Sequence, residues 1–192
     1  MVPLKFLLRI LEAKERGEFF NILDPGYVTP DQFDVFLADV TYSKLKTDMS
    51  QIFGVEYLSQ ATDADAKHIS DIDQAISHGE TYRTIYPCVV CIRDKAYWVF
   101  FIIDSGAPFT YLSSQACKVF GIKEGKPKSA RLAGHNCIIR MSPSSSHFHD
   151  VNILGADFCC LHNITVWHDY YKHKATLYFG HDWEVMKKKA EP

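Results

Sequence analysis

The sequence predicts a mainly β fold, a small closed β barrel or folded sheet with short helices, preceded by an α-helical N-terminal extension. Two observations lead to this prediction. From about residue 82 onward, short apolar and β-branched segments alternate with turn residues, which is typical of strands. Before about residue 60, apolar residues recur every three or four positions, which is typical of amphipathic helices.

The helical extension is assigned to residues 1–58. Its first helix is indicated by leucines at helical spacing, and Gly17 is suited to end it. A second helix starts with Thr29 as N-cap, Pro30 at the first helical position and Gln32 completing a capping box. Its apolar face consists of Phe33, Phe36, Leu37, Val40, Leu45, Met49 and Ile52. The pattern leaves open whether this face packs on the rest of the chain, on a partner or on a second copy.

Residues 59–80 are polar and acidic, and we predict a linker there, with a short helix near Ile69–Ile76. The main domain is assigned to residues 81–182 and a basic tail to residues 183–192. These boundaries divide the chain where its composition changes most.

The main domain begins with a predicted hairpin of Cys88–Ile92 and Ala96–Ile103. The second strand is apolar almost throughout, as expected for a strand buried on both faces. A short helix should follow over residues 113–120 and end at Gly121. The later segments are a basic loop at 123–130, a strand in "ARLAGHNCIIRM", a turn in "SPSSS", a strand and short helix in "FHDVNILGADFCCLHN", and a hairpin of "ITVWHD" with "KATLYFG".

Composition narrows the class of protein. The chain has 192 residues, of which 47% are hydrophobic, enough for a sizeable core, and its net charge of −2 argues against a nucleic-acid surface. Lys5 and Arg9 interrupt the N-terminal apolar run, so it does not match a signal peptide, and no stretch approaches a membrane span. We therefore expect an intracellular, cytoplasmic protein with neither a membrane nor a nucleic acid as partner, and six cysteines that are thiols.

Two patterns resemble metal sites. Cys88 and Cys91 form a C-x-x-C, but positions three apart on a strand face opposite sides, and no second C-x-x-C follows. His147 and His149 share a strand face, without a nearby acid or thiol to complete a site. We predict no metal and no cofactor.

The strongest candidate for chemistry is "VFFIIDSGAP", where an apolar strand ends in Asp104. Gly106 allows a sharp turn and close approach of the backbone, and Ala107 leaves room for a substrate. Two carboxylates that face each other share one proton, so one can activate water while the other polarises an amide carbonyl. The alternative is that Asp104 is only a polar cap on a buried strand.

Asp104-Ser105-Gly106-Ala107 resembles the catalytic loop of retropepsin-like aspartic proteases, the retroviral and retrotransposon type, and "VNILGADF" resembles their later apolar strand and short helix. Together with "YLSSQACKVFGI", the resemblance covers about residues 82–180. It implies an aspartic endopeptidase acting on a peptide or protein substrate, and a homodimer that supplies two copies of Asp104. It implies catalytic roles for Asp104, Ser105 and Gly106, substrate contacts by Ala107, Gly134, Ile153 and Leu154, and a structural role for Asp157.

One departure concerns the flap, the hairpin that closes over the substrate in this family. Only Gly121–Asn152 separates the two motifs, and "RLAGHNCIIRM", with Gly134 as its tip, is the best remnant. An incomplete flap would admit water and weaken substrate binding. The alternative is therefore a catalytically weak or inactive module for dimerisation or peptide binding. A third hypothesis gives the function to residues 1–60, as a partner-binding or oligomerising element.

Overall fold

The computed structural model describes residues 40–180, except for residues 80–81, 124–126, 145 and 147. Most of the predicted N-terminal extension, the basic tail and His147 therefore lie outside the described residues. Within the described residues, no helix combines the length and the apolar composition needed to cross a membrane.

The fold is mainly β, as predicted. Six strands close into a barrel in the order β3-β7-β4-β6-β5-β2, and β2 pairs with β3 to complete the ring. Their bounds are β2 Arg83–Ile92, β3 Lys95–Ile103, β4 Tyr111–Leu112, β5 Lys128–Leu132, β6 His135–Met141 and β7 Asn152–Leu154. The β2–β3 hairpin is antiparallel with Ile92 opposite Lys95, which confirms the predicted pair and leaves a two-residue turn.

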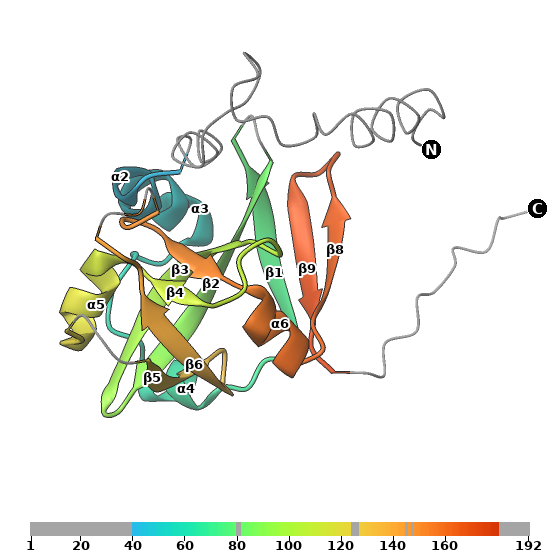
Figure 1. The fold of residues 1–192 in the computed structure, drawn as a ribbon. Coiled ribbons are helices and arrows are strands. Elements are labelled where there is room, and N and C mark those ends of the chain that lie inside the picture. Colours follow the sequence, from blue (N-terminus) through green and yellow to red (C-terminus); the bar gives the residue numbers. More distant parts are fainter. Residues whose placement is uncertain (1–39, 80–81, 124–126, 145, 147, 181–192) are drawn as a thin grey trace, which may run out of the picture. The chain divides into compact units, whose positions relative to one another are not determined.

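Three further strands extend the sheet beyond β2, and Figure 1 shows them beside the barrel. They are β1 Ile72–His78, β9 Lys174–Tyr178 and β8 Thr165–Asp169, in that spatial order. The predicted hairpin of "ITVWHD" with "KATLYFG" is β8 with β9. Strand β8 is the outermost strand of this nine-stranded sheet.

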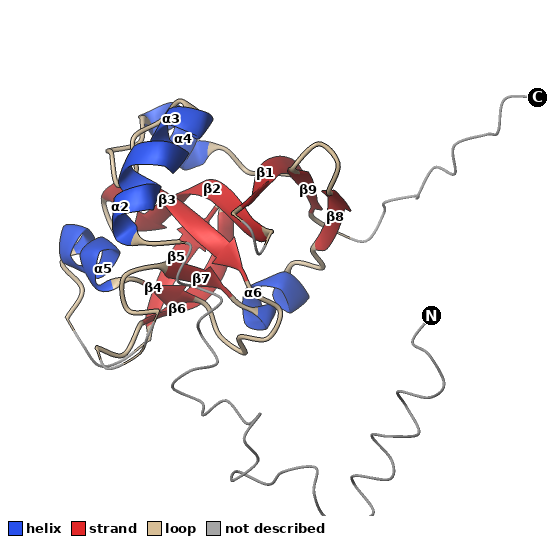
Figure 2. Cartoon of the chain, turned by 90° about the horizontal axis from the view of Figure 1, so that it is seen from above, coloured by secondary structure: helices blue, strands red, loops and turns tan. Residues whose placement is uncertain are grey.

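Short helices flank the sheet, as Figure 2 shows. They are α2 Tyr42–Lys44, the π-helical turn η2 Leu45–Met49, α3 Ser50–Phe53, α4 Asp63–Lys67, α5 Ser114–Phe120 and α6 Ala156–Leu161. Helix α5 confirms the predicted helix: the Ser113 hydroxyl caps its start, and Gly121 ends it with a φ of +70°.

Two predictions about local structure are wrong. The predicted linker, residues 59–80, contains α4 and β1, and β1 pairs with both β2 and β9. The predicted single strand in "ARLAGHNCIIRM" is the hairpin of β5 and β6, because Ala133 and Gly134 both have positive φ and form a two-residue turn.

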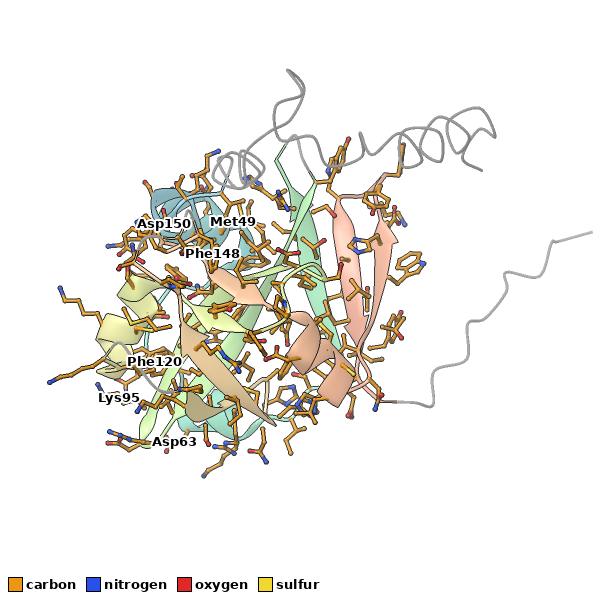
Figure 3. The ribbon with its side chains drawn as sticks, viewed as in Figure 1. Met49, Asp63, Lys95, Phe120, Phe148 and Asp150 are labelled. Carbon is orange, nitrogen blue, oxygen red and sulfur yellow. The ribbon has the colours of Figure 1, made fainter. Side chains whose placement is uncertain are left out.

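The core fills the barrel and the space beneath the N-terminal helical segment. Val99, Phe100, Phe101 and Ile102 of β3 are at most 1% exposed, which confirms that both faces of this strand are buried. Of the predicted apolar helix face, Leu45 and Met49 are fully buried, whereas Ile52 is half exposed. Asp150, labelled in Figure 3, accepts the backbone N–H of Tyr42 at the start of α2 with its carboxylate.

Candidate active site

Asp104 follows the last residue of β3, at the point where two parallel strands end together. Strand β3 pairs in parallel with β7, with Ile103 opposite Leu154. The backbone N–H of Asp104 continues this ladder by donating to the carbonyl of Leu154 at 3.1 Å. Because carboxyl ends of neighbouring parallel strands meet at one edge of a sheet, the two sequence motifs are brought side by side.

The residues after Asp104 form a tight turn. The N–H of Ala107 donates to the Asp104 carbonyl at 3.1 Å, and the N–H of Gly106 donates to Asp104 Oδ1 at 2.8 Å. Asp104 is half-buried, whereas Ser105 and Gly106 are exposed. The turn thus fixes one carboxylate oxygen and presents the Asp104 side chain at the surface.

The loop after β7 supports this turn from behind. Gly155 packs so closely that a Cβ there would lie 2.3 Å from the Phe109 carbonyl oxygen and 2.9 Å from that of Ala107. The next residue, Ala156, donates its N–H to the Ala107 carbonyl at 2.8 Å. Only a residue without a side chain allows the two loops to approach this closely.

Thr110 and Asp157 lock the same junction. The fully buried Thr110 hydroxyl donates to Asp157 Oδ1 at 2.7 Å and accepts the N–H of Gly155 at 3.1 Å. Arg140 of β6 lies 3.7 Å from Asp157 Oδ2 and stacks its guanidinium 3.6 Å from the centre of the Phe109 ring. These contacts agree with the structural role expected for Asp157, and they identify Thr110 as a residue that the sequence analysis missed.

A second network lies deeper, between β3, β7 and α5. The Asn152 side chain, fully buried, donates to the Phe100 carbonyl at 3.0 Å and to the Tyr57 hydroxyl at 2.6 Å, and it accepts the N–H of Ser113 at 2.9 Å. Burial raises the pKa of Tyr57 to about 12, against the opposing effect of its hydrogen bonds to Ser113 and Asn152. The polar Asn152 within "VNIL" was a signal for this network that the sequence analysis did not use.

A hollow of about 350 Å³ opens beside the Asp104 turn. It is lined by Tyr82, Arg83, Thr84, Ile103, Ser105, Val166, His168 and Tyr170. The aromatic rings around this hollow contact one another. His168 stacks on Tyr170 with centroids 5.3 Å apart, and Tyr170 meets Tyr82 edge-to-face. None of these wall residues except Ser105 was predicted, because they come from three segments far apart in the sequence.

Three residues predicted to contact substrate do not present a side chain to an open surface beside Asp104. Ile153 and Leu154 are 2% and 0% exposed, so they belong to the core and support the Asp104 turn without reaching a surface. Gly134 is a hairpin tip, but a Cβ there would lie 2.5 Å from the carbonyl oxygen of His68. The tip is therefore packed against residues 68–70, where the N–H of Ser70 donates to the Ala133 carbonyl, and it does not cover Asp104. Ala107 does lie in the turn, half-buried.

Five of the six thiols are buried or partly buried, and burial raises the pKa of each of them, whereas Cys160 is exposed. Cys88 and Cys91 are buried on β2, and all six cysteines are free. Burial raises the pKa of Cys117 to about 11 and that of Cys137 to about 12. No cluster of three or more histidine, cysteine or acidic side chains suited to a metal ion occurs in the part of the chain that the structure describes.

Comparison with known proteins gives a likeness among solved structures alone. No family model and no curated protein matches the chain. Among solved structures, a retropepsin-like aspartic protease from Rickettsia conorii is similar, with a TM-score of 0.37 and 15% sequence identity. The match covers 57% of this chain and 94% of that chain. This similarity is too low to support an inference about function.

Proposed function

We propose that the protein is an aspartic endopeptidase in which Asp104 and its copy in a second chain activate water. The observation that carries this proposal is the position of the carboxylate. The half-buried Asp104 side chain lies at one end of the closed barrel, on a turn held by the Gly106 N–H and by the loop at Gly155. Such a turn keeps the acid in one place without burying it, as general acid–base catalysis requires.

The proposed chemistry needs two carboxylates. When they lie a few ångströms apart they share a proton, because both cannot be ionised together. The ionised Asp104 takes a proton from water, which attacks the peptide carbonyl, while the protonated copy donates a hydrogen bond to the carbonyl oxygen. The proton that Asp104 has taken up can then pass to the leaving amine, so that no covalent intermediate with the enzyme is needed.

Each chain supplies one Asp104, so the site is complete only with a second copy related by a two-fold axis. The outer edge of β8 and the hollow beside Ser105 support a contact on that side. Strand β8 is an outermost strand, and Tyr170, which lines the hollow with Ser105, is 58% exposed. In the proposed dimer the exposed Ser105 hydroxyls lie near the axis and hydrogen-bond between the two turns.

A second candidate is a dimerisation or peptide-binding module without catalysis. The observation that favours it is the β5–β6 hairpin, whose tip at Gly134 is packed against residues 68–70. This hairpin is therefore part of the barrel and is not available to close over Asp104. An open cleft of this kind would bind peptide but exclude water poorly.

The Asp104→Asn substitution separates the two candidates. We expect the wild-type dimer to cleave members of a peptide library between about pH 4 and pH 7, and D104N to lose at least about 100-fold in rate with unchanged thermal stability. Asp94→Asn, which changes an exposed acid in the turn at the other end of β3, is the matched control and should remain active. A wild-type dimer that binds peptides but cleaves none at any of these pH values would establish the second candidate.

A further inference from the structure

Two histidines meet at the far end of α6, away from the Asp104 turn. His135 is the first residue of β6, and His162 is the C-cap residue of α6. Their ring centroids lie 4.9 Å apart with an angle of 47° between the planes. Two rings from separate elements are therefore in direct contact.

Each ring is also bonded to a backbone carbonyl. His135 Nε2 lies 2.7 Å from the Ser70 carbonyl oxygen, and His162 Nε2 lies 2.8 Å from that of Asn136. A carbonyl oxygen only accepts, so each Nε2 must carry the hydrogen and donate it. In the neutral state both rings are thus Nε2–H tautomers, and a further proton must go to Nδ1.

Phenylalanine rings enclose the pair. His135 stacks on Phe179 with a centroid distance of 4.6 Å and an angle of 5°, and His162 lies 4.7 Å from Phe158. The neighbouring backbone is tied to the same point, because Gly180 donates its N–H to the His162 carbonyl at 3.1 Å. The pair therefore joins the β5–β6 turn, the end of α6, the segment before β1 and the end of β9.

Among the described residues, no ion pair with a carboxylate offsets the positive charge that a second proton would add to the two rings. The pKa of His162 is lowered, chiefly by burial and also by the charge of His135, although its hydrogen bond to the Asn136 carbonyl opposes this. The other titratable or charged groups on the elements that meet here are His68, Asp71, Lys128, Arg131, Cys137, Arg140, Asp157, Cys159, Cys160, Lys174 and Tyr178. Of these, Asp157 is bound to Thr110 and Arg140, and burial raises the pKa of Cys137 to about 12, which keeps it neutral.

We propose that His135 and His162 form a pH-sensitive clamp, which is closed while at least one ring is neutral and opens when both rings are protonated. Two positive rings in contact repel each other, and the partly buried pair is poorly screened by solvent. Opening would release the end of α6 and the β5–β6 turn from the end of β9. Lowering the pH would therefore unfold this region locally.

The direction of the effect follows from linkage. A histidine whose pKa is lowered in the folded state binds fewer protons there than in the unfolded chain. The stability of the closed state is therefore fully present above the ordinary histidine pKa of about 6.5 and is lost as the pH falls below it. This proposal does not depend on peptidase activity.

Hydrogen exchange and NMR on the full-length chain test the clamp. We expect the protection factor of the Gly180 amide, corrected for intrinsic exchange, to fall by about tenfold or more from pH 7 to pH 5 in the wild type. In His162→Gln the fall should be less than about threefold, because glutamine keeps an Nε2 donor for the Asn136 carbonyl but cannot be charged. His149→Gln, at an exposed histidine bonded to the Ser146 carbonyl, is the matched control and should behave as the wild type.

The coupling is tested separately by titrating the ring signals. The His162 ring should titrate below the pH of an ordinary histidine in the wild type, and His135→Gln should move its midpoint upward. An unchanged His162 midpoint in H135Q, or equal loss of Gly180 protection in the wild type and H162Q, would overturn the proposal. If a variant fails to fold, an ordinary midpoint for His162 in the wild type would also overturn it.

Discussion

The hydroxyl of Thr110 donates a hydrogen bond of 2.7 Å to Asp157 Oδ1 and thereby joins the loop after β3 to the first turn of α6. The same hydroxyl accepts the N–H of Gly155. One fully buried oxygen thus links the Asp104 loop to both the turn and the helix that follow β7. The site is held mainly by this junction, since β3 and β7 themselves pair over only three residues.

Thr110→Val should destabilise the protein more than Asp157→Asn. Valine has nearly the shape of threonine but leaves the Gly155 N–H without its acceptor and Asp157 Oδ1 with only the N–H of Phe158, a loss of about 1–3 kcal/mol in the free energy of unfolding. Asparagine at 157 retains an acceptor for Thr110 and loses only the long, partly exposed ion pair with Arg140, so the cost should be below about 1 kcal/mol. Urea unfolding measures both, with Thr110→Ser, which keeps the hydroxyl, as control. Equal losses in T110V and T110S would contradict the role of the hydroxyl.

Glycine substitutions should separate stability from catalysis. In Gly155→Ala the new Cβ would meet backbone atoms at 2.3–2.4 Å, so the two loops must move apart and the protein should lose about 3 kcal/mol or more. In Gly106→Ala the nearest atom is Asp104 Oδ1 at 3.1 Å, the end of a side chain that can turn aside. That variant should keep its unfolding midpoint within a few degrees, but it should displace the carboxylate and lower peptidase activity. A stable, fully active G106A would show that the position of Oδ1 does not matter.

Elements that bury large apolar side chains could be predicted from the sequence. Elements that bury small or polar side chains could not. The β2–β3 hairpin and α5 followed from apolar runs and caps. Strand β1 was hidden because its inward residues are Ala75 and Ser77, which leave no apolar alternation. The position of Gly134 depends on contact with residues 68–70, a tertiary relationship that leaves no local pattern.

Alkaline conditions should destabilise the network around Tyr57. The pKa of this hydroxyl is raised by burial to about 12 in the folded protein, compared with about 10 in the unfolded chain. Its contribution is therefore fully present below about pH 10 and is lost as the pH rises toward 12, an effect on the order of 2–3 kcal/mol. The difference in unfolding free energy between wild type and Tyr57→Phe should shrink over this interval. Since Tyr86 is common to both proteins, it does not contribute to the difference. A constant difference from about pH 9 to pH 12 would mean that Tyr57 does not ionise in the unfolding reaction.

The outer edge of β8 should control dimerisation if the proposed two-fold axis passes near Ser105. Tyr170, 58% exposed and lining the hollow beside Ser105, is the kind of residue that dominates the energy of interfaces. Tyr170→Ala should therefore weaken the dimer by about 30-fold or more, which corresponds to about 2 kcal/mol. Sedimentation equilibrium measures the dissociation constant, and a peptidase assay over a range of protein concentration should show activity lost in proportion to dimer. Tyr171→Ala is the matched control, because Tyr171 is 93% exposed and does not line the hollow. If Y170A remains a tight, active dimer, the contact lies elsewhere although the peptidase proposal stands. If the wild-type monomer is fully active, a dyad made from two chains is excluded.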